Sequence, residues 1–131
     1  MVQLGTLVKV TDKTGISIAA CIKVLGSGKK SIALVGDVVL ISVKYINLLR
    51  FSRMKDKQKQ KYSCGTIHRA LIIRTKSNIM RFPGVFYKFD ENSVVIVNKD
   101  VVPISNRIYG PVIRDLCMRH PSVGCVSRFL V

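Results

Sequence analysis

Positively charged side chains gather in parts of the sequence that are typical of loops. Those with the clearest loop positions form four groups, which are Lys29 and Lys30; Arg74, Lys76 and Arg81; Arg107; and Arg114. Lysine and arginine neutralise phosphates, and loops held apart by rigid strands can follow a phosphate backbone. We therefore predict that these residues bind RNA, against the alternative that each is a solvated surface cation.

Aromatic residues accompany the cations between positions 82 and 89, namely Phe82, Phe86, Tyr87 and Phe89. Aromatic rings in such a place are able to stack on unpaired bases. The competing interpretation assigns Phe89, with either Phe86 or Tyr87, to the hydrophobic core. Because neighbours on a strand face opposite ways, at least one ring must point inward. The aromatic residues are therefore left out of the predicted site.

The sequence contains few residues in arrangements suited to catalysis or metal binding. Acid–base catalysis needs paired carboxylates, or a carboxylate and a histidine, in one cleft, but most acidic residues here lie beside Gly, Asn or Lys in turn-like positions. The sequence contains no GxSxG, P-loop or HExxH motif. The pairs Cys64-x-x-x-His68 and Cys117-x-x-His120 have loose spacing for zinc and come from different kinds of element. We predict no enzymatic activity, no cofactor and no metal site.

Composition restricts the class of protein and its partner. The 131 residues include 22 Lys and Arg against 7 Asp and Glu, giving a formal charge of +15, yet 48% of residues are hydrophobic. Such a chain forms a core, so a disordered basic tail is excluded. Its self-repulsion is best relieved by a polyanion, with nucleic acid the first choice and an anionic membrane surface the second. One domain over residues 1–131 is expected, without a membrane span.

Short segments of β-branched residues separated by turns predict a mainly β fold. Strands are expected at residues 2–10, 16–24, 38–44, 66–75, 85–89 and 94–97, with turns at Asp12–Gly15 and at Pro83-Gly84. The alternation of Ile16, Ile18, Ala20, Ile22 and Val24 predicts that one face of the second strand is buried. Regular spacing without a βαβ rhythm favours a small closed barrel.

The C-terminal segment changes to helical spacing. Pro111 occupies an expected first helical position, and His120-Pro121 is expected to end the helix. Cys21 and Cys125 are interpreted as small core residues, and the cysteines are expected to be reduced because no signal peptide is evident. Residues 45–65 are strongly basic and predict a solvated, mobile loop; the alternative is an arm that becomes ordered on phosphates.

The order of several motifs resembles the large-subunit ribosomal protein 14 family, in its bacterial and organellar form. The N-terminal motifs are Met1-Val2-Gln3, Asp12-Lys13-Thr14-Gly15, Cys21-Ile22-Lys23-Val24-Leu25-Gly26, Val35-Gly36-Asp37 and Ser42-Val43-Lys44. The central and C-terminal motifs are Ala70-Leu71-Ile72-Ile73-Arg74-Thr75-Lys76, Gly84, Phe89, Asn92, Val95-Ile96, Arg107-Ile108-Tyr109-Gly110-Pro111-Val112 and Arg114-Asp115-Leu116.

This resemblance implies a five-stranded barrel with a projecting hairpin and one or two short C-terminal helices. It also implies a structural component of the large ribosomal subunit that binds large-subunit rRNA near the intersubunit face. The implied partners are neighbouring large-subunit proteins, small-subunit rRNA at an intersubunit bridge, and a ribosome-silencing factor. A membrane is not among them.

The departures from the family pattern point to an organelle. Residues 45–65 are longer than the usual connection by about ten residues, an insertion that a surface loop absorbs at small entropic cost. Pro83 and Ser105-Asn106 replace other residues before Gly84 and Arg107, and the match fades after Cys117. We expect a mitochondrial ribosome, the alternatives being a bacterial cytoplasm or a plastid. The competing function is a free-standing barrel that binds and chaperones single-stranded RNA, with its aromatic residues exposed on one surface.

Overall fold

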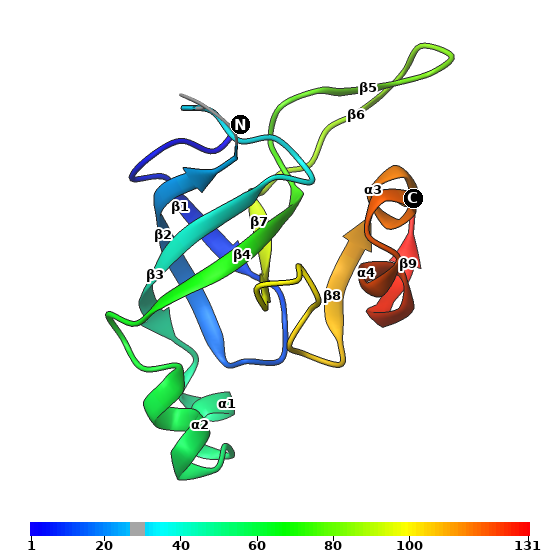
Figure 1. Cartoon of the computed structure of the whole chain (residues 1–131). Coiled ribbons are helices and arrows are strands. Elements are labelled where there is room, and N and C mark those ends of the chain that lie inside the picture. The colour runs from blue at the N-terminus through cyan, green and yellow to red at the C-terminus, as the bar shows by residue number, and fades with distance from the viewer. Residues whose placement is uncertain (27–30) are drawn as a thin grey trace.

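Five strands close into a barrel, with the C-terminal segment packed on one side (Figure 1). The computed structural model describes residues 1–26 and 31–131. The barrel strands are β1 (Leu7–Val10), β2 (Ile16–Leu25), β3 (Val38–Ile46), β4 (Ile67–Arg74) and β7 (Ser93–Val97), in the order β1-β2-β3-β4-β7. A parallel pairing of β1 with β7 closes the sheet. The closed barrel and its strand number confirm the prediction.

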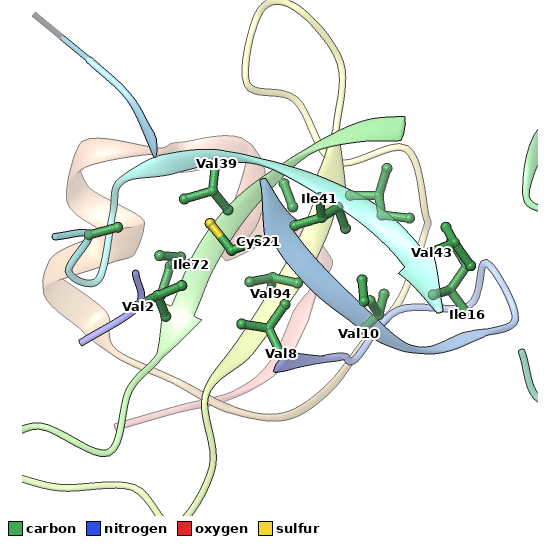
Figure 2. Packing of buried hydrophobic residues seen from close by; sticks show 14 of the residues in the cluster. Val2, Val8, Val10, Ile16, Cys21, Val39, Ile41, Val43, Ile72 and Val94 are labelled. Carbon is green, nitrogen blue, oxygen red and sulfur yellow. The ribbon is translucent and has the colours of Figure 1, made fainter. Parts of the chain in front are cut away.

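Aliphatic side chains fill the interior of the barrel, as Figure 2 shows. Val2 lies toward one end of this core, and Ile16 and Val43 lie toward the other. The expected alternation along β2 is interrupted by register shifts against β3 between positions 16 and 23. Because each shift changes which face a residue occupies, Cys21 is buried while Ile22 is 37% exposed. The predicted burial of Cys21 is confirmed, but the simple period of two is wrong for this strand.

Asp12 joins the β1–β2 turn to β7 inside the protein. Its carboxylate is fully buried and accepts hydrogen bonds from the backbone N–H of Thr14 at 2.9 Å and of Ile96 at 3.1 Å, and from the Thr14 hydroxyl. Burial raises the pKa of Asp12, while these hydrogen bonds oppose the rise. The turn expected at Asp12–Gly15 is therefore also a cross-barrel connection.

A second hydrophobic core lies outside the barrel. Leu71, Ile73, Val95 and Val97 on the outer faces of β4 and β7 pack against the C-terminal segment. That segment contains β8 (Ile108–Val112), α3 (Arg114–Arg119), α4 (Pro121–Val126) and β9 (Ser127–Leu130). All five residues of β7 are buried, which explains its almost continuous apolar sequence. The expected short C-terminal helices are confirmed.

Two details of the C-terminal prediction are wrong. Pro111 lies in β8, opposite Phe129 of β9, and the helix begins three residues later at Arg114. A proline is tolerated there because β8 belongs to a two-stranded sheet, where a residue without an N–H loses no ladder bond on the open side. Pro121 ends α3 as expected but also starts α4. Cys125 is exposed, so its assignment to the core is wrong.

The predicted projecting hairpin consists of β5 (Ile79–Arg81) and β6 (Val85–Tyr87), and it extends away from the barrel (Figure 1). Its turn contains Gly84 with φ +95°, a conformation that glycine adopts without a steric penalty. The hairpin therefore has the tight turn that Pro83-Gly84 predicts.

Residues 45–65 contain two short helices, α1 (Leu48–Ser52) and α2 (Asp56–Lys61), so the expectation of a loop is wrong. Asn47 caps α1 by accepting a hydrogen bond from the backbone N–H of Leu49 at 3.2 Å. Asp56 in the first turn of α2 and lysines in its last turn complement the helix dipole. In the described part of the chain, no helix is long and apolar enough to cross a membrane.

Candidate nucleic-acid interface

Ion pairing involves only a few of the cations that the structure describes. Within residues 1–26 and 31–131, the cations that form ion pairs are Lys9, Lys59, Arg74 and Arg81. Lys76, Arg107 and Arg114 are exposed, and no described carboxylate pairs with them. These three predicted residues are therefore accessible to phosphate. Lys29 and Lys30, also predicted, lie outside the described residues.

Arg74 is placed differently, because it lies between the barrel and the C-terminal segment. Its side chain is only 4% exposed. One guanidinium nitrogen, Nη1, donates to the carbonyl oxygens of Tyr109 at 3.2 Å and Pro111 at 2.9 Å. The other, Nη2, donates to Glu91 at 3.0 Å and to Ser93 at 3.1 Å. The donors of Arg74 thus hold β8 against the end of β4.

Glu91 balances the charge of Arg74 and extends the network to the surface. Its second carboxylate oxygen accepts a hydrogen bond from Lys9 Nζ at 2.9 Å. Burial opposes the charged form of Glu91, but hydrogen bonds from Lys9, Ser93 and Arg74 outweigh it and lower the pKa of the carboxyl group. The ionised carboxylate is therefore the form that the folded protein favours.

Arg81 connects the hairpin to the C-terminal helices. Its guanidinium donates to the Tyr87 hydroxyl at 3.0 Å and pairs with Asp115 of α3 at 3.1 Å. The Tyr87 hydrogen bond, with the charge of Asp115, raises the pKa of Arg81. Since Asp115 follows Arg114 directly, this pair brings the part of the hairpin next to its turn close to an exposed cation of α3. Arg81 itself stays partly accessible.

The predicted residues lie at two ends of the molecule. Lys76 follows β4 and donates its backbone N–H to Asn92 at 2.9 Å, at the end from which the hairpin leaves the barrel. The segment that contains Arg107 and leads into β8 lies at the opposite end, which is also the end of α1 and α2 (Figure 1). Its residues Asn106 and Tyr109 line one cleft with Arg50 of α1. There the Ser105 hydroxyl accepts the N–H of Lys13 and donates to the Arg107 carbonyl. The structure thus separates Arg107 from Lys76 and Arg81, whereas the Arg74 side chain reaches the Tyr109 carbonyl, two residues after Arg107.

The aromatic residues near the hairpin do not share one exposed surface. Phe82 and Phe86 are 93% and 63% exposed, whereas Tyr87 is half-buried. Phe89 packs against the second hydrophobic core. This is the arrangement expected if part of the aromatic set belongs to the core. The surface required by the competing single-stranded RNA chaperone is therefore incomplete here.

The first cysteine–histidine pair, Cys64 and His68, has protein partners of its own. Cys64 Sγ donates to the Lys44 carbonyl, and His68 Nε2 lies 3.0 Å from both the Thr66 hydroxyl and the Lys61 carbonyl. Burial lowers the pKa of His68. Nowhere in the two described ranges do three His, Cys, Asp or Glu side chains gather as a metal-binding group.

A family comparison identifies the fold and the class of protein. The model of the family described as ribosomal protein L14p/L23e matches residues 1–130. This chain belongs to that family. The L14p/L23e family consists of structural proteins of the large ribosomal subunit rather than enzymes, so the protein is a structural component of that subunit and is located in the ribosome. The resemblance noted in the sequence is confirmed over nearly the whole chain.

The range matched by the L14p/L23e family model includes all the predicted site residues, but the match does not distinguish their roles. That distinction comes from geometry. The residue whose role the sequence did not reveal is Arg74, because a buried arginine and an RNA-binding arginine look alike in a sequence. Lys13, Arg50 and Arg53 were not among the predicted site residues, and they line one cleft. The signal in the sequence was the basic charge of residues 45–65, which the alternative interpretation assigned to an arm ordered by phosphates.

Proposed function

We propose that this L14p/L23e protein binds large-subunit rRNA through exposed cations at two ends of a rigid barrel. The predicted contacts are Lys76, Arg81 and Arg114 at the hairpin end, Arg107 at the other end, and Lys29 and Lys30. The observation that supports the proposal is the absence, within the described residues, of carboxylate partners for Lys76, Arg107 and Arg114. Each phosphate that such a side chain neutralises releases counterions and fixes the orientation of the protein on RNA.

Arg74 has a positioning role in this proposal. Its donors bind carbonyl oxygens of β8 and the carboxylate of Glu91, so they are occupied before RNA arrives. By holding β8, Arg74 fixes the start of α3 and with it the position of Arg114. Arg74 therefore supports the RNA contacts of its neighbours through the fold.

The finer assignment follows the family resemblance. The protein is proposed to lie near the intersubunit face, beside other large-subunit proteins, to contribute to a bridge with small-subunit rRNA and to present a surface for a ribosome-silencing factor. Residues 45–65 are proposed as a basic insertion in one domain spanning residues 1–131. This insertion and the divergent C-terminal end support a mitochondrial ribosome.

Association with the large subunit tests the proposal. The double variant Lys76→Ala/Arg114→Ala should reduce co-sedimentation of the full chain with large-subunit particles as salt is raised. Losing two phosphate contacts makes the negative slope of log K against log salt shallower by about 1.8. The matched control is Lys44→Ala/Lys99→Ala, which removes two other exposed lysines and should leave the slope unchanged. An equal effect of both double variants would refute specific contacts at Lys76 and Arg114.

A further inference from the structure

A cationic cleft of about 510 Å³ lies between the inserted helices and one end of the barrel. Its walls come from three separate parts of the chain. The β1–β2 turn contributes Lys13, and α1 with the residue after it contributes Arg50 and Arg53. The segment that leads into β8 contributes Asn106, and β8 itself contributes Tyr109. None of the residues that line the cleft is acidic.

Close contacts with the barrel fix the inserted wall of this cleft. The backbone N–H of Asn47 donates to the Gly15 carbonyl at 2.9 Å. A Cβ at Gly15 would lie 3.3 Å from Met54 Sδ, so the segment after α1 approaches the turn as closely as glycine permits. Tyr62, just after α2, is buried in the barrel core, and Met54 packs against the same core. The cleft is therefore held open by packed side chains.

The charges in the cleft have no internal counterion. Lys13, Arg50 and Arg53 are exposed and have no carboxylate partner among the described residues. Residues 45–65 as a whole contain six Lys and Arg and one Asp, a net charge of +5. The one aspartate, Asp56, pairs with Lys59 on α2. Three cations from two separate segments thus converge on one cleft and repel each other until an anion binds.

An aromatic platform lies beside these cations. The Arg50 guanidinium carbon is 4.7 Å from the centre of the Tyr109 ring, which is half-buried in the cleft wall. An arginine guanidinium over a tyrosine ring is the kind of surface against which an unpaired base stacks. The cleft volume is in the range of small-ligand pockets and matches a nucleotide or two of a single strand.

We propose that this cleft binds an unpaired RNA segment, with Lys13 and Arg53 on its phosphates and a base against the Arg50–Tyr109 pair. The inference rests on the proposed RNA-binding function and adds to it a single-strand site made by the insertion. It assigns a partner to the inserted helices: they complete a cleft for RNA that the barrel alone lacks.

The test uses the full chain and a fluorescein-labelled oligouridylate of twelve nucleotides, with binding measured by anisotropy. The variant Lys13→Gln/Arg53→Gln should weaken binding about tenfold or more. It should also make the negative slope of log K against log salt shallower by about 1.4, the value for two phosphate contacts to a single strand. The control Lys55→Gln/Lys57→Gln removes two exposed charges of the same insertion outside the cleft and should keep the wild-type slope. Equal losses in both variants would overturn the proposal.

Two further measurements separate this site from its alternatives. Ultraviolet cross-linking should place the oligouridylate on a peptide that contains Tyr109, and cross-links confined to the hairpin would overturn the inference. An acidic peptide that displaces the RNA from wild type, while binding the cleft variant poorly, would assign the cleft to a protein and also overturn it. Lys76→Ala/Arg114→Ala should retain oligouridylate binding, so loss of subunit association and loss of cleft binding are observed independently.

Discussion

The contact between Gly110 and Arg74 can be tested by adding a single methyl group. Gly110 lies in β8 with φ +87°, and a Cβ at this position would be 2.7 Å from Arg74 Nη1 and 3.1 Å from its Cζ. Arg74 cannot move away freely, because its side chain is 4% exposed and both terminal nitrogens are hydrogen-bonded. We therefore expect Gly110→Ala to displace the guanidinium from the β8 carbonyls.

The expected loss of stability has two parts. An alanine in the left-handed region costs about 1–2 kcal/mol. A hydrogen bond to a charged group contributes about 1.5–3 kcal/mol, so losing the bonds from Arg74 Nη1 to Tyr109 and Pro111 adds about 3 kcal/mol or more. The sum of about 4–5 kcal/mol corresponds to a fall in Tm of roughly 15 °C for a chain of this length.

Gly65→Ala is the matched control for backbone conformation. Gly65 also has φ +87°, but no atom lies within 4 Å of a Cβ added there. Its substitution should therefore cost only the backbone part, about 1–2 kcal/mol. Urea unfolding of both variants measures the difference, which we assign to the displacement of Arg74. If Gly110→Ala and Gly65→Ala lose the same free energy, the close approach of Arg74 is not a source of stability.

Two carboxylates give further predictions. The pKa of Glu91 is lowered because hydrogen bonds from Lys9, Ser93 and Arg74 outweigh the effect of burial. The charge of Glu91 therefore stabilises the fold above the unfolded pKa, and this stability is lost as pH falls through the folded pKa. When Tm is measured from pH 7 to pH 3, Glu91→Gln should differ least from wild type at pH 3. Asp12→Ala removes the acceptor of the Ile96 N–H and should cost about 2–5 kcal/mol in urea unfolding. The control Asp100→Ala changes an exposed residue, and a comparable loss there would contradict the role of Asp12.

The barrel is predictable from local sequence because its strands are encoded by short apolar segments and glycine turns. The segment at 94–97 is entirely apolar and is buried on both faces in β7, and the turn after Asp12 lies where its residues predict. The inward face of β2 is not predictable in this way. Its register shifts depend on pairing with β3, so the phase of the alternation is set by a partner strand.

The roles of individual cations are less predictable than the strands. Arg74 and Lys76 are two residues apart and have similar neighbours in sequence, but one is buried and the other exposed. The difference arises from β8, which is more than thirty residues away and covers Arg74. Likewise, α2 has no apolar residue, and Leu48 and Leu49 of α1 are exposed, so neither helix shows a buried apolar face in its own sequence. Their order depends on Met54 and Tyr62 packing against the barrel core, a contact that no local pattern reveals.

The balance of charges explains why the insertion needs an external partner. Seven acidic residues cannot neutralise 22 basic ones, and Glu91 already forms ion pairs with both Lys9 and Arg74. Residues 45–65 add a net +5 at the barrel end where Lys13 and Arg107 also lie. Anchoring this charge with Met54 and Tyr62 concentrates repulsion in one place, which costs stability in the free protein. A phosphate backbone removes that cost, so binding of RNA at the inserted helices should raise Tm more at low salt than at high salt.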